Sequence, residues 1–257
     1  MVHPFLRLSD SSLCMKTIST YTQRKVCPIR VGVEDICIED IAHSLALQCR
    51  WMGHCADFYS VAEHCVRVAA YVSLTYINRG KSLEETREAA LVGLLHDATE
   101  AYVSDIPTPI KNHTFLEDGG TLRTFREVEA MIMDSICEKY QIDLTPEIEE
   151  VVKLADDALL ATEARDLVPP TKETKEWLKG FPEPLQGEIK PWTWRESEAR
   201  FLNEFYNLCP REEWRSSHQG EKTLSDLLWS LVEQLFGSKK EAPQEDLRGS
   251  VDDTASD

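Results

Sequence analysis

An adjacent histidine and aspartate, His96-Asp97, lie at the end of an apolar segment, residues 90–95. A buried imidazole beside a buried carboxylate costs desolvation free energy, and a divalent cation can satisfy both while the carboxylate stays ionised. Glu100 follows His96 by four positions, so on a continuing helix its Cβ atom would lie about 5–6 Å away on the same face. There it could act as general acid or base on water at a metal ion. The alternative is a histidine that caps a helix C-terminus beside a solvated Glu100.

Two further segments can supply metal ligands from helices of their own. Ser60 and Glu63 have the spacing of a capping box, which predicts a helix that carries His64 in its first turn. A single histidine in such a place is more often a satisfied core residue. Asp156 and Asp157 are adjacent in another helical pattern and point about 100° apart, so only one of them can face a metal. We expect Asp156 to be the ligand; Asp157 is the alternative, and a solvated helix is the interpretation without a metal.

Helical patterns dominate the rest of the sequence. Apolar spacing and capping residues predict helices from 39 to about 49, from 60 onward, 82–97, 122–140, 145 to before 169, and 196–209. We expect the first of them to end at Arg50-Trp51. β-branched residues predict a short hairpin within residues 17–30, and the segments 112–120 and 173–194 are expected to be a polar loop and a surface wrap. The predicted fold is an all-α helical bundle with a small N-terminal β-hairpin.

The composition changes toward both ends of the chain. We expect residues 1–15 to be a flexible extension or the product of an upstream start codon, and residues 16–215 to form one domain. Residues 216–237 are predicted to be a linker and an amphipathic helix, and the acidic, apolar-poor segment 238–257 is predicted to be disordered. The helix carries Leu227, Leu228, Leu231 and Leu235, which can pack on the domain or form a contact in a homo-oligomer.

Charge and cysteine usage exclude several classes of function. The 257-residue chain is 42% hydrophobic with a formal net charge of −17, which disfavours a nucleic-acid polymer as partner because phosphate backbones need clustered Lys and Arg. The eight cysteines form no C-x-x-C pair and are expected to be reduced core thiols. No apolar run reaches the roughly 18–20 residues of a membrane span, so we expect a soluble, cytoplasmic protein without a membrane partner.

Five segments occur in an order that resembles the HD-domain metal-dependent phosphohydrolases. They are Arg50-Trp51, FYSVAEH (58–64), HDATE (96–100), DIPTPIK (105–111), and AD with ATEARDL (155–167). More narrowly, the sequence resembles the branch that contains bacterial 5′-deoxynucleotidases and related prophage-encoded HD hydrolases. This resemblance also suggests a phage or prophage origin. The resemblance covers residues 36–167 and, more weakly, 17–209.

The resemblance implies a role for each matching residue. His64, His96, Asp97 and Asp156 would bind one divalent metal ion, of Mn, Co, Zn, Mg or Fe. Glu100 would activate the attacking water and protonate the leaving group. The implied substrate contacts are Arg50 to the phosphate, Trp51 to the sugar or base, Asp105 to the sugar 3′-hydroxyl or to the catalytic acid, and Lys111 as a weaker phosphate contact.

The implied activity is hydrolysis of deoxynucleoside 5′-monophosphates to deoxynucleoside and phosphate. One alternative is a dNTP triphosphohydrolase, acting for example on dATP, for which Lys16, Arg24 and Lys25 of the hairpin would supply the extra cations. An alternative from another class is a nucleotide-sensing or protein-binding module with a C-terminal docking helix.

Overall fold

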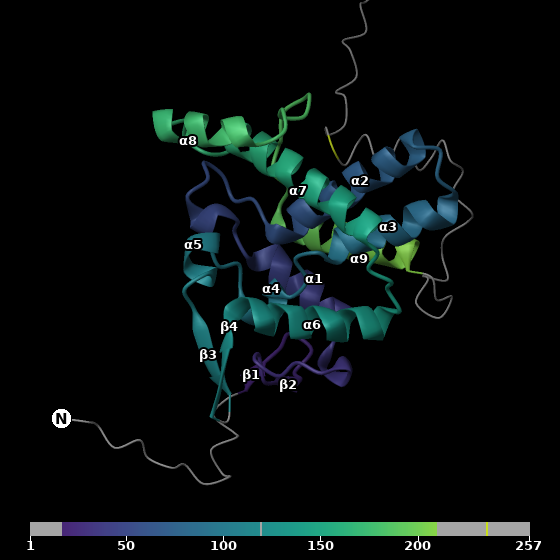
Figure 1. Cartoon of the computed structure of the whole chain (residues 1–257), viewed down its shortest axis with the longest axis vertical. Coiled ribbons are helices and arrows are strands. Elements are labelled where there is room, and N and C mark those ends of the chain that lie inside the picture. Colours follow the sequence, from purple (N-terminus) through teal and green to yellow (C-terminus); the bar gives the residue numbers. More distant parts are fainter. Residues whose placement is uncertain (1–16, 119, 210–234, 236–257) are drawn as a thin grey trace, which may run out of the picture.

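A computed structural model of the chain describes residues 17–118, 120–209 and 235. Helices surround a central core, and two small antiparallel hairpins lie at one end (Figure 1). The helices are α1 (Ile38–Leu47), α2 (Val61–Asn78), α3 (Leu83–Leu95), α4 (Glu100–Val103), α5 (Thr108–Lys111), α6 (Phe125–Tyr140), α7 (Pro146–Asp166), α8 (Lys172–Trp177) and α9 (Trp194–Leu208), and the strands are β1 (Ile18–Ser19), β2 (Lys25–Val26), β3 (Phe115–Asp118) and β4 (Thr121–Thr124). The predicted helical bundle with an N-terminal hairpin is confirmed.

Helix α2 is the centre of the bundle. It contacts α1, α3, α7 and α9, and most of its residues are buried around its whole circumference. A helix that is buried on all sides can present a side chain to several neighbours at once. This position explains how His64, in the first turn of α2, can reach residues that come from α3 and α7.

Helices α2 and α3 pack closely because a glycine stands at their contact. A Cβ atom on Gly93 would lie 3.2 Å from Val72 Cγ2 and 3.3 Å from the Ala69 Cα atom. Contacts this short are tighter than ordinary van der Waals contact, so a Cβ atom here would require its neighbours on α2 to shift by a few tenths of an ångström. Gly93 lies one turn before His96 and thereby sets the distance between the helices that carry the two histidines.

The predicted helix starts are largely confirmed. Ser82 forms a reciprocal capping box with Glu85, and Thr145 caps α7 with Pro146 at the first helical position. Ser60 also caps α2 by accepting a hydrogen bond from the Glu63 amide. The capping box predicted there is wrong in its second half, because the Glu63 side chain turns inward to other partners.

Glu63 and Arg67 form a buried ion pair within α2. Arg67 Nη2 lies 2.7 Å from Glu63 Oε1, and the Trp192 amide donates to Glu63 Oε2 at 2.8 Å. The Arg67 guanidinium also stacks 4.8 Å from the centre of the Trp192 ring. Burial raises the pKa of Glu63 to about 7 against the opposing effect of Arg67. These contacts attach the segment before α9 to the central helix.

One sequence prediction for the connecting segments is wrong. Residues 112–120 were expected to be a loop, but Phe115–Asp118 pairs with Thr121–Thr124 in an antiparallel hairpin. Residues 173–194 include the short helix α8 as well as extended backbone. The hairpin within residues 17–30 is present as predicted, with Ile18 opposite Val26.

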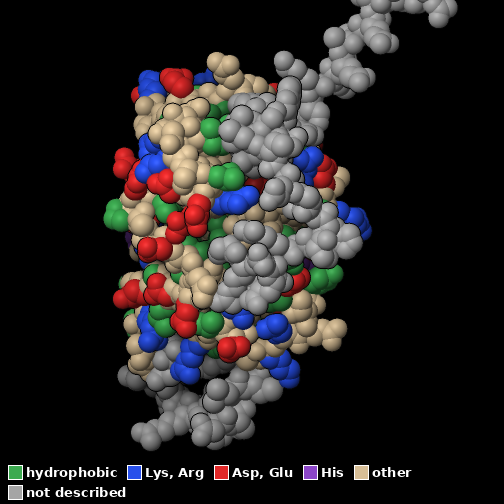
Figure 2. All heavy atoms as spheres, turned by 90° about the vertical axis from the view of Figure 1, so that its right-hand side faces the viewer, with side chains coloured by type: hydrophobic (Ala, Val, Ile, Leu, Met, Phe, Trp, Pro, Cys, Tyr) green, Lys and Arg blue, Asp and Glu red, His purple; other side chains and the backbone are tan. Residues whose placement is uncertain are grey.

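The predicted extension 1–15, most of the segment 216–237 and the tail 238–257 lie outside the described residues. Leu235 is described: it is buried against Ala70 of α2, and its carbonyl accepts a hydrogen bond from Arg67 Nη1 at 2.8 Å. For this residue the structure therefore favours packing on the domain. Among the described helices, none is long and apolar enough to cross a membrane. On the face drawn in Figure 2, Lys and Arg side chains are interspersed with Asp and Glu in the described part of the chain.

Candidate metal centre

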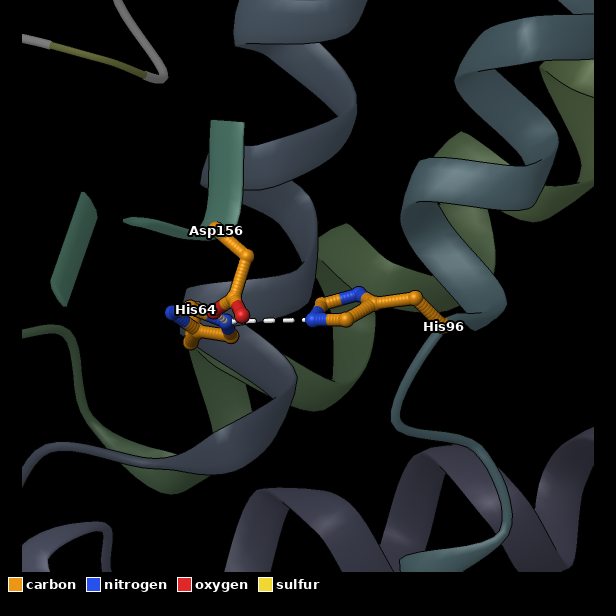
Figure 3. Close-up of side chains that lie close together, drawn as sticks. All are labelled: His64, His96 and Asp156. Carbon is orange, nitrogen blue, oxygen red and sulfur yellow. Dashed lines mark hydrogen bonds and ion pairs between the residues drawn. The ribbon is translucent and has the colours of Figure 1, made fainter. Parts of the chain in front are cut away.

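Two histidines and two aspartates from separate parts of the chain converge at the core of the bundle. His64 Nε2 lies 3.3 Å from His96 Nε2 and 3.3 Å from Asp156 Oδ1. Figure 3 shows the three side chains pointing toward one another from α2, the end of α3 and α7. Asp97 Oδ2 lies 3.3 Å from His96 Nε2 and 3.8 Å from His64 Nε2. All four predicted ligand residues are thus brought together.

The outer nitrogens of both imidazoles have partners that orient the rings. His64 Nδ1 lies 2.6 Å from the carboxylate of Glu163, and His96 Nδ1 lies 2.8 Å from the carbonyl oxygen of Gly93. Both partners accept a hydrogen bond, so in the neutral form of each imidazole Nδ1 carries the proton and Nε2 presents its lone pair to the cluster. In that form the two Nε2 lone pairs face each other at 3.3 Å, and the Cys65 thiol also interacts with His96. A divalent cation fits this donor set, because it accepts both lone pairs and neutralises the carboxylates.

Charges at the cluster favour the ionised carboxylates. Burial opposes ionisation, but the charge and hydrogen bond of His96, together with His64 and Arg50, hold the pKa of Asp97 well below its usual range. His64 likewise lowers the pKa of Asp156 to about 2 despite burial. Burial disfavours charged imidazoles, but Asp97 raises the pKa of His96 well above its ordinary value. Without a cation, protons on the histidines thus balance the negative charge.

Asp157 takes no part in this cluster. Its carboxylate forms an ion pair with Lys153 one turn earlier on α7, whereas Asp156 Oδ1 faces His64. The two side chains diverge as expected of neighbours on a helix. The geometry therefore favours Asp156 over the alternative ligand Asp157.

Arg50 and Trp51 lie beside the cluster but not at the end of a helix. Helix α1 ends at Leu47, so the predicted helix boundary is wrong. Arg50 lies in the connection that follows, and Trp51 begins a single 3-10 turn, Trp51–Gly53. Arg50 Nη1 is 3.4 Å from Asp97 Oδ2, and Arg50 Nε is 3.1 Å from Glu163 Oε2. The Trp51 indole also donates to Glu163 Oε2 at 3.3 Å, and its ring meets Trp177 of α8 edge to face. Glu163 thus fixes the metal ligand His64 and both loop side chains.

The loop backbone around Trp51 is strained. Trp51 and Met52 have φ values of 58° and 52°, in the left-handed region that non-glycine residues rarely adopt. Such conformations cost about 1–3 kcal/mol each and cluster at functional sites. The strained backbone thus belongs to the segment whose Arg50 and Trp51 side chains both contact Glu163.

Glu100 is buried beside the cluster, although the helix that carries His96 does not continue to it. Helix α3 ends at Leu95, a turn follows, and Glu100 begins α4 with 4% of its surface exposed. The prediction of one continuous helix is wrong. Glu100 Oε1 lies 3.2 Å from Lys111 Nζ, while Oε2 is buried without a hydrogen-bond partner among the described residues. Burial, Asp97 and Asp105 raise the pKa of Glu100 to about 9.

Lys111 and Asp105 are both placed near Glu100. Lys111 Nζ bridges Glu100 and Glu129, which lies 2.7 Å away on α6. Asp105 is partly buried in the loop after α4, and its amide donates to Gln48 Oε1 at 2.9 Å. Lys111 is therefore already neutralised by two carboxylates, whereas the Asp105 carboxylate acts on Glu100 through its charge.

An apolar cavity adjoins the cluster at His96 and Asp156. It has a volume of about 270 Å³ and opens between α3, α6 and α7 beside His96 and Asp156. Its lining is mainly aliphatic, including Leu95 and Val152, with Lys153 at the α7 side. His96 and Asp156 thus border apolar side chains, whereas Asp97 borders the charged Arg50.

Sequence reasoning missed the role of Glu163. This residue is fully buried, with contacts to His64, Arg50 and Trp51, yet the sequence pattern around it indicates no function. One signal was present: Glu163 follows Asp156 by seven positions, so both lie on one face of the helix. Glu129, the second partner of Lys111, was also missed.

A helical bundle that gathers two histidines and two aspartates around one point has the architecture of an HD-domain protein. Comparison with known proteins identifies the family. A family model described as 5′-deoxynucleotidase YfbR-like matches residues 41–204. The chain therefore belongs to the YfbR-like 5′-deoxynucleotidase family of HD-domain proteins.

Two relatives from bacteria show how far the similarity extends. The chain is 34% identical over 194 residues to the uncharacterized protein YfdR of Escherichia coli K12, an alignment that covers 76% of this chain and 96% of YfdR. It is 30% identical over 155 residues to the uncharacterized protein RCAP_rcc00048 of Rhodobacter capsulatus, covering 59% and 72% of the two chains.

Proposed function

We propose that the protein is a metal-dependent phosphohydrolase that converts deoxynucleoside 5′-monophosphates to deoxynucleoside and phosphate. The observation that carries this proposal is the convergence of His64, His96, Asp97 and Asp156 on one point, with the buried Glu100 beside it. Membership of the YfbR-like family supports the same reaction class.

The four converging side chains would hold one divalent ion. His64 and His96 would use their Nε2 atoms, and Asp97 and Asp156 one carboxylate oxygen each, because these atoms face one another. When bound, a divalent cation lowers the pKa of coordinated water and screens the phosphate charge. Two imidazoles with two carboxylates are compatible with Mn, Co, Zn, Mg or Fe.

Glu100 would act as the general base and acid. It takes a proton from the attacking water as the oxygen bonds to phosphorus, and it returns the proton to the 5′-oxygen as the phosphorus–oxygen ester bond breaks. Lys111 holds one carboxylate oxygen, and Oε2 is left for the water. The ammonium of Lys111 opposes the pKa-raising effect of burial only in part, since the pKa of Glu100 is about 9 without a metal. The charge of a divalent cation at the cluster would further favour the ionised base.

The loop residues would bind the substrate. The planar guanidinium of Arg50 can pair with two phosphate oxygens, and Glu163 orients it from behind. Trp51, braced by Trp177, offers an aromatic surface for the sugar or base. We assign the 3′-hydroxyl of the sugar to Asp105. It follows Glu100 by five positions, and its charge contributes to the raised pKa of Glu100.

The charges near the cluster favour a monophosphate over a triphosphate. A triphosphate needs several cations, yet Lys111 is engaged by Glu100 and Glu129. Arg24 of the N-terminal hairpin, one of the extra cations that a triphosphate would need, donates to the Glu34 carbonyl at 2.9 Å. Lys25 of the same hairpin is exposed, and Lys16 lies outside the described residues. Of the candidate substrate cations that the structure describes, Arg50 is the one whose guanidinium lies within 3.4 Å of a candidate metal ligand, Asp97.

A Glu100→Gln variant tests the assignment of the general base. We expect phosphate release to fall by about 10²–10⁴-fold, since general acid–base catalysis contributes that much, while the content of bound metal is unchanged. Glu84→Gln, an exposed change in the first turn of α3, is the matched control and should keep full activity. A fully active Glu100→Gln enzyme would refute the assignment.

A further inference from the structure

Two cysteines lie at the ends of the loop that carries Arg50 and Trp51. Cys49 directly precedes Arg50, and Cys55 follows four residues after Trp51. Their Sγ atoms are in contact at 3.5 Å, and both residues are free thiols that are partly accessible to solvent. A disulfide needs an S–S distance of about 2.05 Å. A local movement of roughly 1.5 Å would therefore join the two sulfur atoms.

Both ends of the loop are attached to the rest of the domain. Cys49 pairs with Ser60, the residue that caps α2, and the Arg50 amide donates to the Tyr59 carbonyl at 2.9 Å. Cys55 lies after the strained left-handed turn, and its thiol donates to the Arg50 carbonyl at 3.7 Å. The amide of Ala56, next to Cys55, donates to the Leu167 carbonyl at 2.8 Å. Closure would thus draw both ends of the loop toward each other, across the Arg50 carbonyl.

The other described thiols lack this combination of access and partner. Cys65 and Cys209 are completely buried, and Cys37 is held by the Glu39 carboxylate at 3.0 Å. In a Cys49–Cys55 pair each thiol can resolve an oxidised form of the other without any change in the helices.

We propose that Cys49 and Cys55 form a reversible disulfide that displaces the Arg50–Trp51 loop and lowers nucleotide hydrolysis. The oxidant is a hydroperoxide. One thiol attacks its oxygen and becomes a sulfenic acid as water or an alcohol leaves. The second thiol then attacks the sulfenic sulfur, the S–S bond forms, and a water molecule is released. Two electrons pass from the sulfur atoms to the hydroperoxide, and a dithiol reductant reverses the change.

The effect on activity rests on the proposed function and follows from the contacts of Arg50. Its guanidinium reaches Glu163 and Asp97 at 3.1 and 3.4 Å, at the long end of hydrogen-bond distances. A shift of the Arg50 backbone toward Cys55 breaks these contacts and misplaces the guanidinium. Because Arg50 is assigned to the phosphate, we expect the oxidised protein to lose at least about fivefold in kcat/KM, through a higher KM.

The disulfide can be detected without any assay of activity. Trypsin cleaves after Arg50, so a Cys49–Cys55 bond links the peptide 31–50 to the peptide 51–67. The metal-loaded protein is treated with hydrogen peroxide at about pH 8.5, because burial and the neighbouring Cys49 raise the pKa of Cys55 and only the thiolate reacts. Free thiols are then alkylated, and fragment spectra of the linked peptides separate Cys49 and Cys55 from Cys37 and Cys65.

The expected result is a Cys49–Cys55 linkage that dithiothreitol removes, with kcat/KM restored. Cys49→Ser and Cys55→Ser should show neither the linkage nor the loss, whereas Cys27→Ser, a partly buried thiol of the N-terminal hairpin segment, should behave like the wild type. Absence of the linkage, or a linkage between other cysteines, would overturn the proposal. A Cys49–Cys55 linkage with unchanged kcat/KM would overturn the displacement of the loop. Lack of hydrolysis by the reduced protein would refute the proposed function separately, since the peptide measurement does not depend on it.

Discussion

Glu163 accepts a hydrogen bond from His64 Nδ1 at 2.6 Å, although the two residues lie 99 positions apart in the sequence. Both side chains are fully buried. The second carboxylate oxygen of Glu163 receives Arg50 and Trp51. One buried carboxylate therefore orients a candidate metal ligand on α2 and the candidate phosphate-binding loop together, and it links metal binding to substrate binding.

Replacing Glu163 with Gln should weaken metal binding. The amide nitrogen would face the donors of Arg50 or His64, so at least one of the contacts is lost. Removing such an outer partner of a ligating histidine typically costs about 10–100-fold in metal affinity, which competition with a fluorescent chelator measures. Glu150→Gln, an exposed change on the same helix, should leave the affinity unaltered. Wild-type affinity in Glu163→Gln would contradict the orienting role.

The neighbouring pair Asp156 and Asp157 provides a test within one turn of helix. Asp156→Asn should bind at most a small fraction of the metal held by the wild type, because it removes a carboxylate that faces His64. Asp157→Asn removes only a surface pair with Lys153, which is worth little, and should keep its metal. Metal content by plasma mass spectrometry gives the answer, and the opposite ranking would make Asp157 the ligand.

Gly93→Ala should destabilise the protein. The added Cβ would press on the Ala69 backbone and the Val72 side chain, and overpacking of this kind costs about 1–3 kcal/mol. The better helix propensity of alanine returns about 1 kcal/mol, so we expect a net loss of about 1 kcal/mol in urea unfolding. Gly180→Ala, where a Cβ meets open space, is the control. A variant as stable as that control would show that the contact of α2 with α3 is not tight.

Glu100 predicts a pH dependence of stability in the metal-free protein. Its pKa is about 9 in the folded state against 4.5 ordinarily. Between these values the folded protein binds a proton that the unfolded chain has released, so raising the pH lowers the free energy of unfolding. Glu100→Gln cannot titrate, and its stability relative to wild type should therefore increase from pH 5 to pH 9. Urea midpoints in the presence of a chelator measure this difference, and parallel pH profiles would disprove the raised pKa.

Residues whose positions depend on local structure were predictable from the sequence. Ser82 and Thr145 cap their helices through contacts within three residues, so the helices that carry His96 and Asp156 could be placed from spacing alone. The resemblance to a known family then selected which polar residues face the same point. The helical fold was predictable for the same reason, since most of its signal is the local apolar period.

Features that depend on distant partners were missed. The burial of Glu163 depends on His64 and Arg50, which no local pattern around α7 indicates. The spacing from His96 predicts Glu100 on a continuing helix. Instead α3 ends at Leu95, and a turn leads to α4, which begins at Glu100. The sequence between β3 and β4 is a Gly-Gly pair that does signal a turn. The strands are only four residues long and expose Phe115 and Leu122, so they lack the regular apolar alternation that marks a half-buried sheet.

The most direct measurement is chromatographic separation of the products that the purified, metal-supplemented protein releases from deoxynucleoside 5′-monophosphates and dNTPs, with Glu100→Gln alongside. We expect deoxynucleoside and inorganic phosphate from the monophosphates, and almost no product from the variant. Deoxynucleoside with triphosphate from the dNTPs alone would contradict the proposed substrate, and no turnover with any of the five metals would favour a nucleotide-sensing or protein-binding module.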